Sequence, residues 1–188
     1  MFVQQRNFDS HFNQQLMQRS IPIALFLIIA AFGTLLALST GSDKPDETDT
    51  NQILQEAVFT DLQGQEISME DFSGKTVLID IWETWCTPCI RSMPTLQQLM
   101  EDYPDDFVVL AVSPGYMDSE DDVREFISNN EYDFEFVFGE DFTEALQVQS
   151  IPYKIYVNPS GEYVTTVLGS HGPEEDYEKT REIIEDHL

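Results

Sequence analysis

The chain has 188 residues, of which 41% are hydrophobic and 12% aromatic, so it can build the core of one domain of ordinary size and is not a disordered chain. Its formal net charge of −26 argues against binding to the negatively charged backbone of nucleic acids. Molar salt would largely screen this charge, so the acidity fits either a salt-loving source or simply an acidic, soluble surface.

A long apolar segment, residues 21–38, lies near the N-terminus and contains no charged residue. As a helix this segment would rise roughly 27 Å, close to the thickness of the hydrocarbon core of a bilayer. Arg6 and Arg19 precede the segment and acidic residues follow it. This charge asymmetry predicts that the N-terminus is cytoplasmic and that the rest of the chain lies outside the cytoplasm.

A cleaved signal peptide is the alternative interpretation of this segment, because residues 37–39 loosely resemble a cleavage site. Both the polar lead and the apolar run are longer than a signal peptide usually has, so we favour a retained anchor. We therefore expect three segments before the folded domain: a cytoplasmic tail (1–20), a transmembrane anchor or uncleaved signal (21–39) and an acidic, flexible linker (40–53).

Residues 54–188 show the patterns of short strands and amphipathic helices, and we expect them to form one domain. Buried strands are expected at 76–82 and 107–112, which are nearly continuous apolar runs. The other expected elements, in chain order, are two short strands around Gly64, helices over 89–103 and 119–130, a strand over 134–138, a short helix, strands over 153–157 and 162–168, and a helix from Pro173. This order predicts an α/β fold with helices on both faces of a mixed sheet.

The only two cysteines, Cys86 and Cys89, form a single CxxC motif after the first buried strand. A zinc site needs about four ligands, and the chain offers only three histidines, which are widely scattered. A purely structural bridge across so short a loop would remove little entropy from the unfolded chain. The motif therefore favours a redox dithiol.

The position of the motif gives each cysteine a separate role. A helix is expected to begin at the CxxC, so Cys86 would lie at its N-terminus, where unpaired backbone N–H groups and the helix dipole stabilise a thiolate. Pro88 fits the first helical turn, because its missing N–H would have no partner there. We expect Cys86 to be the nucleophile and Cys89, one turn deeper, to be the resolving thiol.

The sequence GKTVLIDIWETWCTPC, with Pro94 five residues after Cys89, resembles the thioredoxin superfamily. The segments FTDLQGQEISMEDFSGK and SIPYKIYVNPSGEYV resemble its TlpA/ResA-like branch, which is membrane-tethered and extracytoplasmic. The resemblance covers residues 56–188. It implies a thioredoxin-like three-layer fold, in which helices flank a central mixed sheet and a β-hairpin extends the N-terminus.

The resemblance also implies roles for individual residues. Ile151-Pro152 matches the cis-proline step whose backbone pairs with a bound substrate, although an ordinary trans proline would be expected from these residues alone. Asp80 matches a buried acid that assists proton transfer at the resolving cysteine, and burial should raise its pKa. The expected catalytic residues are Cys86, Cys89, Asp80 and Pro152, and the expected substrate-binding residues are Trp85, Thr87, Pro88, Ile151 and Gly169.

Two residues depart from the family pattern. Ser92 stands where many TlpA-like proteins have a glutamate, which weakens the inference of a role in cytochrome c maturation. Glu83, three residues before Cys86, would tend to raise the pKa of the thiol and favour basic substrates. A solvated surface acid is the alternative interpretation of Glu83.

Together these features predict a membrane-anchored, extracytoplasmic oxidoreductase that exchanges disulfides with partner proteins, as a reductant, without a bound cofactor or metal. Its partners would be disulfide-bearing or dithiol proteins and a membrane protein that supplies electrons. A thiol peroxidase is one alternative, but the motif P-x-x-x-T-x-x-C is absent before both cysteines. A copper carrier that binds Cu(I) through the two thiolates and His171 is another.

Overall fold

The computed structural model describes residues 47–188. The expected cytoplasmic tail, the expected anchor and the first part of the expected linker, residues 40–46, lie outside the described residues. Within residues 47–188, every helix is too short or too polar to cross a membrane.

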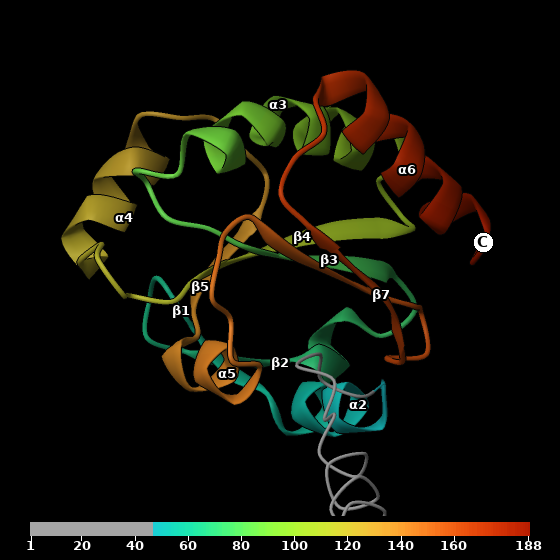
Figure 1. Cartoon of the computed structure of the whole chain (residues 1–188), viewed down its shortest axis with the longest axis horizontal. Helices are drawn as coiled ribbons and strands as arrows, with labels where there is room; N and C mark the ends of the chain where they lie inside the picture. The colour runs from blue at the N-terminus through green and yellow to red at the C-terminus, as the bar shows by residue number, and fades with distance from the viewer. Residues whose placement is uncertain (1–46) are drawn as a thin grey trace, which may run out of the picture. The chain divides into compact units, whose positions relative to one another are not determined.

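A seven-stranded mixed sheet forms the centre of the domain, in the order β2-β1-β5-β4-β3-β6-β7 (Figure 1). The strands are β1 (Val58–Asp61), β2 (Glu66–Ser68), β3 (Thr76–Ile81), β4 (Phe107–Ser113), β5 (Glu135–Phe138), β6 (Tyr153–Val157) and β7 (Tyr163–Leu168). Strands β3, β4 and β5 are parallel, and the other pairings are antiparallel. Every residue of β3 and β4 is buried, which confirms the prediction of two buried central strands.

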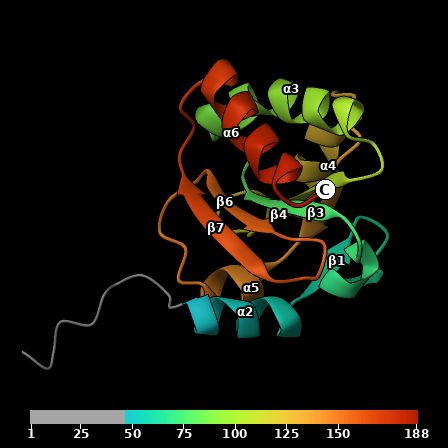
Figure 2. The ribbon, with the colours of Figure 1, turned by 90° about the vertical axis from the view of Figure 1, so that its right-hand side faces the viewer.

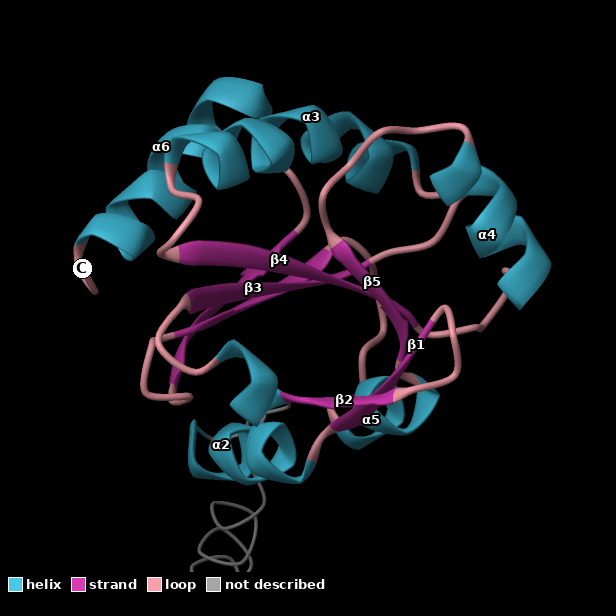
Figure 3. Ribbon diagram, turned by 180° about the vertical axis from the view of Figure 1, so that it is seen from behind, coloured by secondary structure: helices cyan, strands magenta, loops and turns pink. Residues whose placement is uncertain are grey.

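Helices cover both faces of this sheet, as predicted from the order of the elements (Figures 1 and 2). One face carries α3 (Thr87–Asp102), α4 (Glu120–Ser128) and α6 (Pro173–Glu185), and the other carries α2 (Glu47–Glu56) and α5 (Glu140–Ala145). Figure 3 shows the same layers from behind, with the β1–β2 hairpin at one edge of the sheet. A short 3-10 helix, η1 (Met69–Phe72), precedes β3. The predicted thioredoxin-like three-layer fold with an N-terminal hairpin is confirmed.

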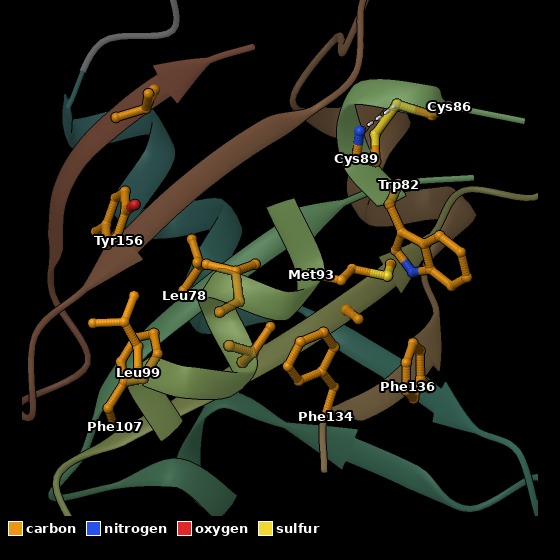
Figure 4. Packing of buried hydrophobic residues seen from close by; sticks show 14 of the residues in the cluster. Leu78, Trp82, Cys86, Cys89, Met93, Leu99, Phe107, Phe134, Phe136 and Tyr156 are labelled. Carbon is orange, nitrogen blue, oxygen red and sulfur yellow. Dashed lines mark hydrogen bonds between the residues drawn. A yellow bond between two sulfur atoms is a disulfide. The ribbon is translucent and has the colours of Figure 1, made fainter. Parts of the chain in front are cut away.

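The alternation of side chains along β3 decides which residues face α3. Leu78 and Trp82 belong to the same core cluster as Cys86 and Cys89 (Figure 4). Val77, Ile79 and Ile81 of β3 contribute to the core on the opposite face. Because successive side chains of a strand point to opposite faces, Asp80 points to the same face as Leu78 and Trp82. The buried acid therefore faces the layer that contains both cysteines.

The prediction of a flexible linker over residues 40–53 is wrong for its second part, because residues 47–53 belong to helix α2. Leu54 of this helix is fully buried in the core. The side-chain oxygen of Asn51 accepts a hydrogen bond from the backbone N–H of Tyr163 in β7, at 2.8 Å. The sequence of the helix is mostly polar, because only Thr50 and Leu54 are buried in the core, and so it lacks the apolar pattern that would predict a helix. Packing against the sheet makes this segment part of the domain.

Candidate active site

The carboxyl end of the central strand β3 lies beside segments of three other strands, all at the same end of the sheet. Ile81 pairs with Val112 of β4 and with Tyr153 of β6, and Tyr153 pairs with Leu168 of β7. The chain segments next to these positions are the CxxC after β3, the Ile151–Pro152 step before β6 and Gly169 after β7. The structure therefore brings to one edge the residues that the sequence predicted as parts of one site.

The two cysteines form a disulfide, with their Cα atoms 5.3 Å apart. Cys86 is the N-cap residue of α3, and its sulfur accepts a hydrogen bond from the backbone N–H of Cys89 at 3.3 Å (Figure 4). Cys89 is fully buried and Cys86 is 2% exposed. A thiolate on Cys86 would be stabilised there by the unpaired N–H groups and dipole of the helix. This geometry agrees with the roles predicted for Cys86 as nucleophile and Cys89 as resolving thiol.

The residues around the dithiol differ in exposure. Trp85 is 53% exposed, Thr87 is also exposed and Pro88 is half-buried, so these three side chains border the surface next to Cys86. Trp82, in contrast, is fully buried, and its ring packs at 5.7 Å between centroids against Phe136. Trp82 therefore belongs to the core, whereas substrate contact by Trp85, Thr87 and Pro88 stays a prediction that their positions allow.

The peptide bond between Ile151 and Pro152 is cis, as the resemblance implied. The carbonyl oxygen of Pro152 accepts a hydrogen bond from the N–H of Gly169 at 2.9 Å. Gly169 has a φ of 78°, which favours glycine, and a Cβ at this position would meet no atom within 4 Å. This open space agrees with the predicted role of Gly169, in which a partner's backbone passes close to the chain.

Asp80 is 2% exposed, and its Oδ1 atom has no hydrogen-bond partner within residues 47–188. Burial raises the pKa of Asp80 to about 6, while the nearby charge of Lys154 lowers it and that of Asp176 raises it. A carboxyl group with such a pKa can bind and release a proton near neutral pH. Its burial and its position on the α3 face support the predicted role as a proton carrier.

Lys154 and Asp176 form a buried ion pair that the sequence analysis missed. The Nζ of Lys154 lies 3.8 Å from Oδ2 of Asp176, and the two residues are 2% and 6% exposed. Lys154 is also the direct partner of Asp80 in the pairing of β3 with β6. Asp176 accepts further hydrogen bonds from the hydroxyl of Ser170 at 2.6 Å and from the N–H of His171 at 2.9 Å. The sequence contained one signal that could have predicted this pair: Lys154 stands inside an apolar strand, where a buried lysine needs an acidic partner.

Glu83 is fully buried, so the interpretation of this residue as a solvated surface acid is wrong. Its Oε2 atom accepts a hydrogen bond from Nε1 of Trp85 at 2.7 Å, and its Oε1 atom accepts one from the N–H of Met117 at 2.8 Å. Its backbone carbonyl accepts the N–H of Cys86 at 2.9 Å. The carboxyl group of Glu83 therefore lies in a desolvated position beside the dithiol.

Ser92 is buried in α3, and its hydroxyl donates to the carbonyl of Cys89 at 2.8 Å, so it is satisfied within the helix. Within residues 47–188, no three His, Cys, Asp or Glu side chains are placed to hold a metal ion together. His171 lies beside Asp176, with 3.9 Å between its Nδ1 and Oδ1 of the acid. The alternative copper site made of His171 and the two cysteines is therefore not formed in this structure.

A mixed sheet with a CxxC disulfide at a strand-to-helix junction, and a cis-proline at the same edge, defines the thioredoxin-like class of thiol-disulfide oxidoreductases. The chain belongs to the AhpC/TSA family, whose sequence profile matches residues 50–164, more than half of the chain.

Relatives and solved structures agree with this class. The thiol-disulfide oxidoreductase ResA of Bacillus cereus is 29% identical over 174 residues, which cover 88% of this chain and 91% of that protein. ResA of Bacillus subtilis is 28% identical over 144 residues, covering 75% and 74%. The thioredoxin domain of a thiol-disulfide oxidoreductase from Bacteroides vulgatus superposes with a TM-score of 0.58 at 26% identity, covering 68% of this chain and 91% of that domain. The chain is thus a ResA-like thiol-disulfide oxidoreductase with Cys86 and Cys89 as its CxxC pair.

Proposed function

We propose that the protein reduces disulfides in partner proteins outside the cytoplasm. In the reduced form, the Cys86 thiolate attacks one sulfur of a partner disulfide, the other partner sulfur leaves as a thiolate, and a mixed disulfide forms. Cys89 then loses its proton and attacks the sulfur of Cys86, which releases the second partner thiolate and leaves the Cys86–Cys89 disulfide. Two electrons pass to the partner. The observation that carries the proposal is the hydrogen bond from the N–H of Cys89 to the sulfur of Cys86 at the start of α3.

Asp80 is the proposed acceptor of the proton that Cys89 loses. Its carboxyl group is buried on the face of the sheet that α3 covers, and its pKa of about 6 allows it to be ionised before the step and protonated after it. Lys154 and Asp176 set the electrostatic environment of this carboxyl group, since they lower and raise its pKa, respectively.

The charges around the dithiol support the proposed direction of transfer. An oxidant of this class is strong when its reduced, thiolate form is stabilised. Here two carboxyl groups are buried, that of Asp80 on the sheet face that α3 covers and that of Glu83 three residues before Cys86, and a negative charge close to a thiol opposes its thiolate form. These two acids support a low reduction potential and therefore a reductant.

The N-terminal sequence supports the proposed location. Residues 21–39 would anchor the protein in the membrane, with residues 1–20 in the cytoplasm and the oxidoreductase domain outside it. An anchored domain can receive electrons repeatedly from a membrane protein, which is the partner we propose for its re-reduction. Ser92 lacks the carboxylate that many TlpA-like proteins carry at this position, so a role in cytochrome c maturation is not part of the proposal.

Equilibration of the full-length protein in glutathione buffers of graded potential tests the direction of transfer. A reductant keeps its disulfide even in strongly reducing buffers, whereas a disulfide donor stays oxidised only in the most oxidising ones. Thiol alkylation followed by mass measurement reports the oxidised fraction. The second outcome would replace the proposed reductant with a donor that uses the same atoms.

A trapping experiment tests the two cysteine roles. The Cys89→Ala variant should accumulate a mixed disulfide with a disulfide-bonded test protein such as insulin, because Cys86 can still attack but nothing resolves the product. The matched Cys86→Ala variant should form none. Trapping by Cys86→Ala alone would reverse the assignment. Consumption of hydrogen peroxide by Cys89→Ser would instead revive the peroxidase alternative.

A further inference from the structure

The buried carboxyl group of Glu83 accepts hydrogen bonds from two surface segments, the one that precedes the dithiol and the loop after β4. One oxygen accepts the indole N–H of Trp85, directly before the dithiol, at 2.7 Å. The other oxygen accepts the backbone N–H groups of Met117 and Asp118, in the loop after β4, at 2.8 Å and 3.3 Å. Trp85 and the backbone of Met117 are therefore held by the two oxygens of a single carboxylate.

A second carboxylate makes the reciprocal connection. Asp118 accepts hydrogen bonds from the backbone N–H and the hydroxyl of Thr84, the hydroxyl bond being 2.8 Å long. Residues 83–85 and 117–118 are thus joined in both directions, although about 30 residues of helix and strand separate them in the chain. The loop after β4 is fixed beside the dithiol by these bonds.

The side chain of Trp85, held by its indole N–H, and the side chain of Met117, whose backbone is held, are apolar and exposed. Trp85 is 53% exposed and Met117 is 76% exposed, and we call these two residues the apolar pair. Large exposed apolar side chains that lie beside a reactive group are typical of contact surfaces for partners. A tryptophan with a fixed indole also loses little conformational entropy on binding. The neighbouring Tyr116 is not included, because its hydroxyl bonds to Thr143 of α5 at 3.1 Å.

Acidic residues follow the apolar pair directly. Glu120, Asp121 and Asp122 form the first turn of α4, only three residues or so beyond Met117. Within this helix, Arg124 is the one basic residue, and it pairs with Glu120. A partner segment that contacts the apolar pair would therefore meet a negative potential, which favours a basic side chain on the partner.

We propose that Glu83 is a positioning residue for substrate recognition, which holds the apolar pair so that it binds a protein segment with an apolar and a basic side chain next to its cysteine. This inference rests on the proposed function and names the class of its protein substrates. Glutamine at position 83 cannot replace the carboxylate, because its NH₂ group would face either the indole N–H or the backbone N–H as a second donor.

The test uses the reduced full-length protein and two synthetic peptides, each with one cysteine in a mixed disulfide with glutathione. In the first peptide leucine and lysine flank the cysteine, and in the second serine and glutamate do. Each turnover oxidises the Cys86–Cys89 dithiol and releases one reduced peptide and one reduced glutathione. Oxidised glutathione is the reference substrate, and the reduced protein is the only reductant, so the quantity compared is the ratio of the second-order rate constant of dithiol oxidation by a peptide to that by oxidised glutathione.

The wild type should favour the leucine–lysine peptide over the serine–glutamate peptide by about tenfold in this ratio. The free energy gained when one methionine side chain is buried is large enough to account for this preference. Met117→Ser should remove most of the preference, and Met117→Leu should keep it. Glu83→Gln should also remove it, and the double variant should lose no more than either single variant, because both act through the same contact. Val58→Ser is the matched control, since Val58 is 56% exposed on β1, which β5 and β4 separate from β3.

Equal ratios for the two peptides in the wild type would overturn the inference and leave the proposed function intact. A preference that survives in Met117→Ser, or additive losses in the double variant, would also overturn it. Failure of the wild type to reduce any of the three disulfides would instead contradict the proposed function itself.

Discussion

Asp80 and Lys154 are direct partners in the antiparallel pairing of β3 with β6, and both are almost completely buried. Side chains of direct partners point to the same face of a sheet, so this acid and this base share the face that α3 covers. Lys154 also pairs with Asp176 of α6. Three charged groups therefore occupy one region from which water is excluded, and a change in one of them should alter the others.

The Asp80→Asn variant should be more stable than the wild type at pH 8. The folded-state pKa of about 6 exceeds the model-peptide value of 3.8, so stability contributed by the protonated Asp80 is complete below pH 3.8 and is lost as the pH rises through 6. Asparagine stays neutral, and the gain should reach about 3 kcal/mol at most. Urea unfolding of both proteins at pH 4 and pH 8 measures the difference.

At pH 4 the two proteins should differ little, because Asp80 is then protonated in the folded wild type. The same variant should slow the release of partner from the Cys86 mixed disulfide, since Cys89 loses its proton acceptor. If the difference in unfolding free energy between Asp80→Asn and the wild type were the same at pH 8 as at pH 4, burial would not raise the pKa of Asp80.

The Lys154→Met variant should lower the free energy of unfolding by about 3–5 kcal/mol, because Asp176 would remain buried without its charge partner. The pKa of Asp80 should rise further, since Lys154 lowers it. Adding Asp176→Asn should restore part of the stability. Lys179→Met is the matched control on the exposed side of α6 and should change stability by less than about 0.5 kcal/mol. Equal effects of the two lysine variants would contradict a buried pair.

Leu54→Ala should lower the free energy of unfolding by about 2–5 kcal/mol, because it opens a cavity beneath helix α2, where Leu54 is fully buried. Gln55→Ala, at the exposed neighbouring position, should have an effect below about 0.5 kcal/mol. Denaturant unfolding of both variants checks the pair. If helix α2 did not pack against the sheet, the two substitutions would be equally harmless.

Thermal stability should rise with salt concentration, because the net charge of −26 repels itself in dilute buffer. The Debye length falls from about 10 Å at 0.1 M to about 3 Å at 1 M salt, so the melting temperature should increase by about 5 °C or more over this range. Sucrose at equal osmolarity is the control for general solute exclusion. A melting temperature that is independent of salt would contradict adaptation to a saline environment.

Much of the fold was predictable because its signals are local. The short apolar runs of β3 and β4 favour buried strands, and the sequence from Asn158 to Gly161 favours a turn, in which Gly161 adopts a φ of 82°. Helix α2 was not predictable in this way, because its stability comes from Leu54 and from the bond between Asn51 and Tyr163, residues that are 112 positions apart.

The candidate site divides along the same line. The sequence by itself determined the dithiol and its place at the start of a helix, because both depend on neighbouring residues in one short motif, whereas the cis-proline step and the role of Asp80 were implied by the resemblance to the thioredoxin superfamily. Only the tertiary structure decided that Lys154 and Asp176 share the environment of Asp80, and that Glu83 is buried and holds Trp85 to Met117. Those contacts join segments that the sheet brings to one edge, and the energy of a buried charge depends on such distant neighbours rather than on its own sequence context.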